Sequence, residues 1–298
     1  MQLERIAAAA IALAAAVMIY SVLAFCQASE ASAYTLGVGD GAQFPAQPSA
    51  DLGAKTYRVV IDPALPLEDY TPRILAHRAV GQEPQLVIGG TGTRNHASSR
   101  GLVRAAVEAA NRWPSAYSVS VVNEPNESGM SVCEYARTYL AAYRSLRAMG
   151  VKRVLFGEWS PNNTLGWQAA TLRKCPRTSK ALHGKIKHVA WHGYGPAIDY
   201  GRAIVGITRQ FAGQTPKLYV TEAGFMVSYQ GVVKAASVAD NGGVRYWRHA
   251  MNVAKRELSQ IVAWDVHSPQ SGAWDSGLID GNGRPRPAFN VIAGAARN

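Results

Sequence analysis

The sequence predicts an α/β protein with a single (β/α)8 barrel, preceded by a separate N-terminal segment. Short β-branched or apolar runs alternate with longer helical stretches rich in alanine and arginine, which is typical of βαβ units and a parallel sheet. Eight such pairs fit in residues 34–298, close to the length of about 250 residues that is typical of this barrel. An open doubly wound sheet usually carries a Gly-x-Gly-x-x-Gly turn after its first strand, and no such motif opens a helix there.

The N-terminal segment is set apart by its composition. Residues 7–25 form an almost unbroken apolar run, preceded by Arg5 and followed by the small residues Ala31-Ser32-Ala33. This pattern predicts a signal peptide over residues 1–33. The run is also long enough for a retained membrane anchor. In either case we expect residues 34–298 to work outside the cytoplasm, secreted or anchored by residues 7–25.

The barrel strands are recognised by their short runs of β-branched and apolar residues. We expect them, in chain order, at residues 35–38, 57–61, 85–88, 118–122, 153–156, 188–191, 217–221 and 260–264.

The helices between the strands are longer, and some carry capping residues at their ends. Ser98 and Ser131 are candidate N-caps, and Gly150 follows a helix as a stop signal. We expect helices near residues 46–54, 67–80, 98–111, 133–149, 165–175, 197–211, 232–257 and 287–296.

Charge and cysteine content limit the partners. After removal of residues 1–33 the chain has 30 basic and 18 acidic residues, a net charge of +12, which favours anionic surfaces such as an acidic polysaccharide or cell wall. The arginines are scattered singly and no nucleic-acid-binding motif accompanies them, so we expect no nucleic-acid partner.

The histidines lack zinc-ligand spacing, and we expect no metal or cofactor. Cys133 and Cys175 form either one disulfide or two thiols.

Polar and aromatic side chains mark the ends of the expected strands, where a barrel places its catalytic residues. His192 or Trp264 alone could be explained as a core residue. The candidates as a group, however, would all lie on one face of the barrel. The candidates are Arg58 in strand two, Asn123 and Glu124 after strand four, Glu158 and Trp159 after strand five, His192 and Tyr194 after strand six, Glu222 after strand seven, and Trp264 and Asp265 after strand eight.

Two of these carboxylates suggest a chemistry. Cleavage of a glycosidic bond needs one carboxyl group to protonate the leaving oxygen and another to stabilise or attack the anomeric carbon. Glu124 and Glu222 come from two strand ends and fit this pattern. Glu158 is a competing partner for Glu124. An aldolase or lyase would need a lysine at a strand end, and Lys152, Lys187 and Lys217 precede their strands.

Several motifs resemble clan A of the retaining glycoside hydrolases, (β/α)8 enzymes with catalytic glutamates at the ends of strands four and seven. The strand-four sequence is similar to the β-xylosidase and α-L-iduronidase family and to the cellulase-like family. The motifs are Gly-Ala-Lys-Thr-Tyr-Arg-Val-Val at 53–60, Asn-Glu-Pro-Asn at 123–126, His-Gly-Tyr at 192–194, Thr-Glu-Ala-Gly-Phe at 221–225, and the closing segment 277–289.

The resemblance implies that Glu124 is the general acid/base and Glu222 the nucleophile of a retaining glycosidase. The acid would need a less solvated place that raises its pKa, and the nucleophile would stay ionised beside Arg58 and Tyr194. Carboxyl groups about 5 to 5.5 Å apart would indicate retention.

The remaining candidates are expected to bind the sugar or to shape its pocket. Asn123 would bond the sugar 2-hydroxyl, and Trp264 would stack on the ring, extended by Trp159, Trp167 and Trp274. His192 and Glu158 would shape the pocket, and Asp62 and Asp265 would meet hydroxyl groups.

The expected partner is a carbohydrate, with a positive rim that favours an anionic glycan. The segments 174–187 and 268–287 are expected to form walls of the cleft. The alternative is a barrel that binds carbohydrate without cutting it, or a cell-surface interaction protein. The two readings differ in whether both glutamates line one cleft within reach of Arg58 and Tyr194.

Overall fold

The structure, a computed structural model, describes residues 34–39, 46–89, 98–229, 232–264, 266 and 274–297. The N-terminal segment 1–33 and Asp265 lie outside these residues, as do residues 268–273, the first part of the expected cleft wall 268–287. Among the described residues, none of the helices combines the length and hydropathy needed to cross a membrane.

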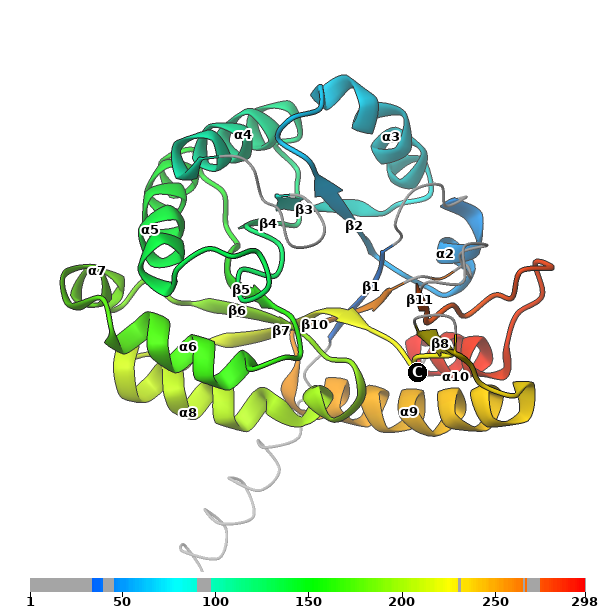
Figure 1. The fold of residues 1–298 in the computed structure, drawn as a ribbon. Helices are drawn as coiled ribbons and strands as arrows, with labels where there is room; N and C mark the ends of the chain where they lie inside the picture. The colour runs from blue at the N-terminus through cyan, green and yellow to red at the C-terminus, as the bar shows by residue number, and fades with distance from the viewer. Residues whose placement is uncertain are drawn as a thin grey trace, which may run out of the picture. The chain divides into compact units, whose positions relative to one another are not determined.

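Eight parallel strands close into a barrel, which confirms the predicted fold (Figure 1). Their order around the barrel is β1-β10-β7-β6-β5-β4-β3-β2, and the ring closes where β1 pairs with β2, with Gly37 opposite Thr56. The strands are β1 (Thr35–Gly39), β2 (Thr56–Ile61), β3 (Glu83–Ile88), β4 (Ser118–Val121), β5 (Val154–Trp159), β6 (His188–His192), β7 (Lys217–Ala223) and β10 (Gln260–Trp264).

The strands are buried along nearly their whole length, because the barrel interior covers one face and the helices cover the other. All six residues of β5 are buried, as are five of the six in β3. Such strands are continuous apolar runs rather than alternating ones, which is why the sequence identifies them well.

The helices surround the barrel (Figure 1). Both predicted N-caps are present: the Ser98 hydroxyl accepts from the Gly101 N–H at 3.1 Å and the Ser131 hydroxyl from the Glu134 N–H at 3.2 Å. The helices are α2 (Ala46–Asp51), η1 (Leu67–Tyr70), α3 (Thr71–Ala79), α4 (Ser99–Arg112), α5 (Val132–Ala148), α6 (Thr164–Arg173), α7 (Pro176–Leu182), η2 (Gly195–Tyr200), α8 (Gly201–Ala212), α9 (Ala236–Glu257) and α10 (Pro287–Arg297).

The segment 174–187 differs from its prediction. Residues 176–182 form α7, which packs against α5, α6 and α8 in the outer layer rather than walling a cleft. Pro176 favours this helix, because its fixed φ suits the first helical position.

The helix expected from residue 232 begins later, at Ala236. Val232 and Val233 form a short strand, β9, in a small antiparallel sheet with β8 (Ser228–Tyr229) and β11 (Trp274–Asp275). Two adjacent β-branched residues favour this strand pairing over a first helical turn.

Candidate active site

The candidate residues meet at the carboxyl ends of the barrel strands. Arg58 comes from β2, Glu158 from β5, His192 from β6 and Glu222 from β7, and Glu124 lies three residues beyond β4. Four of these side chains are almost fully buried, and the Glu124 side chain is 25% exposed. Five ionisable groups from five strands therefore form one cluster at this end of the barrel.

The backbone that carries two of the glutamates is held in an unfavourable conformation. Val122, Glu124 and Glu158 have φ values of 70°, 46° and 62°, in the left-handed region that non-glycine residues rarely adopt. The Glu124 N–H donates to the Glu158 carbonyl at 2.9 Å, and the Val122 N–H donates to that of Ile88 at 2.6 Å. Strain of this kind persists only where surrounding contacts fix it, and it concentrates at functional sites.

Glu222 is held from two sides, as the sequence predicted. Nη1 of Arg58 lies 2.7 Å from Oε1 of Glu222, an ion pair that lacks the alignment of a hydrogen bond. The Tyr194 hydroxyl donates to Oε2 at 3.0 Å. A cation and a phenol therefore face the same carboxylate.

His192 lies between the two candidate catalytic glutamates. Its Nδ1 is 2.9 Å from Oε1 of Glu124 and 3.3 Å from Oε2 of Glu222. One oxygen of each carboxylate and a His192 ring nitrogen all lie within 4.8 Å of one another. The two carboxylates thus face each other across a single imidazole.

Glu158 belongs to the interior rather than to the sugar-binding surface. It is fully buried, and its oxygens accept from Ser120 and Thr221, each at 2.9 Å, and from Arg58 at 3.0 Å. Burial would raise its pKa, but the Arg58 charge and the His192 contact lower it to about 2. Its carboxylate therefore meets the cluster through the charges of Arg58 and His192.

The charge on His192 follows from the same contacts. Burial alone would lower its pKa, but Glu222, Glu124 and Glu158 together raise it to about 9. The imidazole is therefore protonated at neutral pH and, with Arg58, offsets the charges of the three carboxylates.

The two glutamates differ from the expected order of solvation. Burial would raise the pKa of Glu124, but the hydrogen bond and charge of His192 outweigh it and lower that pKa. Burial raises the pKa of Glu222 despite His192 and Arg58, and its side chain is only 9% exposed. The expectation that Glu124 is the less solvated group with the raised pKa is wrong, because Glu124 is nearer the surface and bonds the imidazolium.

Asn123 and Trp264 both contact Arg58 at the catalytic end of the barrel. Asn123 is almost fully buried and its Oδ1 accepts from Arg58 at 2.7 Å. The half-buried indole of Trp264 stacks against the Arg58 guanidinium, 4.8 Å from the ring centre. A Cβ on Gly39 would collide with Cε3 of this indole, so the ring position requires glycine there.

The other aromatic candidates do not extend this platform. Trp159 is fully buried and packs edge-on against Phe156 at 5.2 Å, so its predicted contact with sugar is wrong and it is a core residue. Trp167 packs partly buried against the core from α6, near Tyr135. Asp62 turns back to accept from the Ala64 N–H at 2.9 Å. The side chain of Trp274, like Asp265, lies outside the described residues.

The sequence did not identify the residues that hydrogen-bond Glu158 from inside the barrel or those that anchor the Glu124 loop. Ser120 from β4 and Thr221 from β7 both donate to Glu158. Period-two alternation back from Glu124 is a signal that could have identified Ser120, whereas Thr221 directly precedes Glu222, at a register shift that no local pattern contains. The loop that carries Glu124 is tied to the end of β5, where Ser160 donates its N–H to Asn126 at 3.0 Å and its hydroxyl to Glu127 at 2.8 Å.

A disulfide lies in the helical layer beside this loop. Cys133 in α5 and Cys175 before α7 are bonded, with a sequence separation of 42. Of the two alternatives left by the sequence, the structure has the bonded pair.

One group of side chains among the described residues could reach a single metal ion. It consists of Glu124, His192 and Glu222. A ligating histidine must be neutral, and the raised pKa of His192 together with the adjacent Arg58 opposes a cation there.

The comparisons with known proteins support the fold. No family model matches the chain, and no curated protein matches its sequence. Solved structures with a similar fold include a glucosidase from Croceicoccus marinus (10% identity over 90% of this chain and 67% of the other, TM-score 0.65). Another is an endo-β-1,4-glucanase from Xanthomonas axonopodis pv. citri (14% identity, 89% and 99% coverage, TM-score 0.62). A third is an endo-β-1,3-glucanase from Amycolatopsis mediterranei in complex with laminarihexaose (16% identity, 87% and 98% coverage, TM-score 0.54).

Proposed function

We propose that this protein is a retaining glycoside hydrolase of the clan A type. The observation that carries the proposal is the opposed pair Glu124 and Glu222 at the ends of β4 and β7, with carboxylate oxygens within 4.8 Å of each other. Inverting enzymes hold their carboxyl groups about 6.5 to 9.5 Å apart to leave room for a water, whereas retaining enzymes hold them about 5 to 5.5 Å apart. The close approach of the oxygens supports the retaining arrangement.

In the first step, Glu222 attacks the anomeric carbon while Glu124 gives a proton to the leaving oxygen. The glycosidic bond breaks and an ester forms between the sugar and Glu222. In the second step, Glu124 takes a proton from water, the water oxygen attacks the anomeric carbon, and the ester bond breaks to release the sugar and the free Glu222 carboxylate. Arg58 and Tyr194 support the nucleophilic role of Glu222, because both face its oxygens.

The lowered pKa of Glu124 has to be reconciled with its role as proton donor. Nδ1 of His192 lies 2.9 Å from Oε1 of Glu124, and a proton on this nitrogen would point at the carboxylate. A sugar bound over the cluster excludes water and disfavours separated charges. We infer that this proton then moves from His192 to Glu124, which leaves a neutral imidazole and a carboxylic acid at the leaving oxygen.

The substrate class follows from the chemistry of the pair and from the neighbouring structures. Proteins of similar fold include a β-1,4-glucanase and a β-1,3-glucanase, so these two polymers come first in a substrate panel. An anionic glycan is a further member, because the chain is basic. The apolar N-terminal run and the disulfide support a location outside the cytoplasm, where disulfides persist.

The test is hydrolysis of β-1,4-glucan, β-1,3-glucan, xylan and a uronate-containing glycan by the purified protein. Glu124→Ala and Glu222→Ala are each expected to lower the release of reducing ends by roughly a hundredfold or more, and Glu108→Ala, at an exposed position on α4, should leave it unchanged. Glycan binding without hydrolysis by the unmodified protein would favour the alternative of a non-catalytic barrel. Equal activity in Glu222→Ala and the unmodified protein would exclude Glu222 as the nucleophile.

A further inference from the structure

The opposite end of the barrel, where the strands begin, carries a group of cations that the proposed catalysis does not use. The segments 147–153, 183–188 and 213–217 lead into β5, β6 and β7, which are neighbours in the barrel, and they contain no acidic residue. We call the cations of these segments the strand-start patch. Its members are Arg147, Lys152, Arg153, Lys185, Lys187 and Lys217.

These cations lack acidic partners. Within the described part of the chain, none of the six forms an ion pair, whereas Arg104, Arg112 and Arg286 elsewhere each face a carboxylate. Arg147, Lys152, Lys187 and Lys217 are exposed to solvent. Charges of one sign that gather without partners repel one another and create a positive potential that attracts anions.

The pKa of His188, at the start of β6, is shifted by that potential. Burial and the charges of Arg153, Lys217, Arg147 and Lys187 lower its pKa to about 4. The cations are therefore close enough to act together on one half-buried imidazole, as a group rather than as scattered surface charges.

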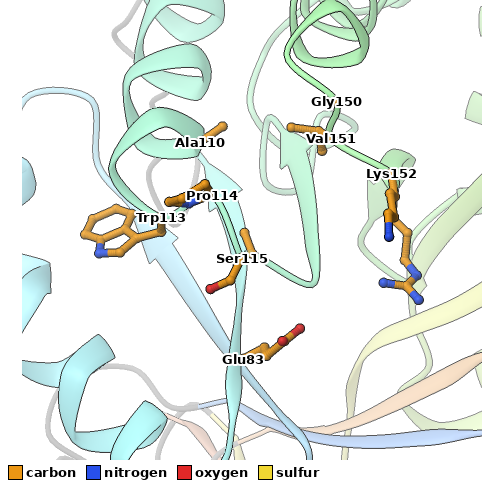
Figure 2. A pocket seen from close by; sticks show the side chains of 10 residues that line it. Glu83, Ala110, Trp113, Pro114, Ser115, Gly150, Val151 and Lys152 are labelled. Atoms are coloured by element: carbon orange, nitrogen blue, oxygen red, sulfur yellow. The ribbon is translucent and has the colours of Figure 1, made fainter.

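The patch has further features of a surface-binding site. A pocket of about 250 Å³ opens beside it, between the C-terminal ends of α4 and α5. In Figure 2, Lys152 lies across this pocket from Ser115 and Glu83. Met149 is one of the few large apolar side chains that is exposed, at 37% of its surface, and it lies within the segment that carries Lys152.

We propose that the strand-start patch is a docking surface for a bilayer that contains anionic phospholipid. Cations beside an exposed apolar side chain suit a lipid surface, where headgroups meet the charges and Met149 can reach the acyl boundary. β1 begins at the same end of the barrel as these three segments, because all eight strands are parallel. Docking here leaves the strand ends with Glu124 and Glu222 directed away from the bilayer, open to a polymer.

The test is co-sedimentation of residues 34–298 with vesicles of phosphatidylcholine, with or without about one-third phosphatidylglycerol. This stretch contains every barrel strand and all of the described core, so it folds without the apolar run that would itself bind lipid. The patch variant combines Lys152→Glu, Lys187→Glu and Lys217→Glu. The matched control combines Arg137→Glu, Arg245→Glu and Arg248→Glu, which change the net charge equally at exposed helix positions.

Each Lys or Arg near an anionic bilayer contributes roughly fivefold to partitioning. We therefore expect the patch variant to bind anionic vesicles at least roughly thirtyfold more weakly than the unmodified protein, and the control variant to bind within about twofold. The unmodified protein and both variants should not bind neutral vesicles. Circular dichroism confirms folding, and a Lys→Gln version of the patch variant replaces it if the charge reversal prevents folding.

Two outcomes would overturn the proposal. Equal loss of binding in the patch and control variants would show that net charge alone is responsible. Binding of the unmodified protein to a soluble polyanion such as polygalacturonate, but not to anionic vesicles, would show that the patch serves a polymer. Neither outcome depends on whether the protein hydrolyses glycans, because no residue of the cluster around Glu222 is changed.

Discussion

Nδ1 of His192 lies 2.9 Å from Oε1 of Glu124, so the proposed acid/base of this barrel rests against an imidazolium rather than against solvent alone. The same nitrogen is 3.3 Å from Oε2 of Glu222. One proton on one ring therefore sets the charge that both glutamates experience, and the site should respond to pH through His192.

Loss of this proton should weaken the fold at high pH. The pKa of His192 is raised from 6.5 to about 9 in the folded protein, so its stabilising contribution is complete below pH 6.5 and is lost as the pH rises to 9. The expected loss is about 3 kcal/mol. The free energy of unfolding in urea, measured across this range, should fall in the unmodified protein and change much less in His192→Gln. His249→Gln, at an exposed position, is the control, and an unchanged slope in His192→Gln would contradict the account.

Glu158→Gln should destabilise the protein although the substitution changes no surface group. It removes one of the two carboxylates that face the buried Arg58, the one at 3.0 Å, while Glu222 remains at 2.7 Å. Breaking a buried ion pair from one side costs about 3 to 5 kcal/mol, and the remaining partner places the expected loss at the lower end of that range. Because the pKa of Glu158 is lowered from 4.5 to about 2, its contribution is present above pH 4.5 and disappears as the pH falls to 2. Urea unfolding at neutral and acid pH measures both effects. A loss no greater than in Glu108→Gln, whose side chain is 57% exposed, would show that Glu158 carries no such charge interaction.

Gly39→Ala should impair substrate binding through Trp264. The added methyl group collides with the indole and must displace it from Arg58 and from the proposed sugar position. We expect KM to rise roughly tenfold, equivalent to about 1.4 kcal/mol, and Trp264→Ala to act in the same direction. Gly206→Ala, which has open space around it in α8, should leave KM unchanged. A Gly39→Ala variant that is less stable but has an unchanged KM would show that the position of Trp264 does not affect substrate binding.

Removal of the disulfide should lower stability without changing the catalytic cluster. Cys133 and Cys175 close a loop with a sequence separation of 42 residues, and a bridge of this kind stabilises by about 2 to 4 kcal/mol. The double variant Cys133→Ser/Cys175→Ser should unfold at a correspondingly lower urea concentration. Unmodified protein unfolded in reductant should match it, and a difference between the two would mean that the serines disturb the helices directly.

The fold was accessible from the sequence because the signals that specify it are local. Parallel strands such as β5 are buried on both faces and therefore form unbroken apolar runs, and caps such as Ser131 mark helix starts. α7 was missed because a short helix that begins at a proline has little periodicity. The start of α9 was misplaced because Val232 and Val233 pair with a distant strand, an interaction that no local pattern contains.

The site was partly accessible for the same reason. Strand ends identify Glu124 and Glu222, because a barrel gathers its strand ends on one face, and Arg58 stands out as a cation within an apolar strand. The burial of Trp159 and the position of His192 between two carboxylates depend on how side chains from different strands meet, and only the structure supplies that. The order of the two glutamate pKa values follows from those contacts, and for this reason the sequence expectation for Glu124 was wrong.

The most direct test of the central claim is to trap the covalent intermediate on Glu222. A 2-deoxy-2-fluoro derivative of the sugar that the panel identifies as the substrate slows the second step, so the glycosyl ester accumulates. Intact mass measurement should show one added sugar, and peptide mapping should place it on Glu222 in the unmodified protein and show none in Glu222→Ala. A label on Glu124 or Glu158, or hydrolysis of the parent sugar with inversion at the anomeric carbon, would contradict the assignment.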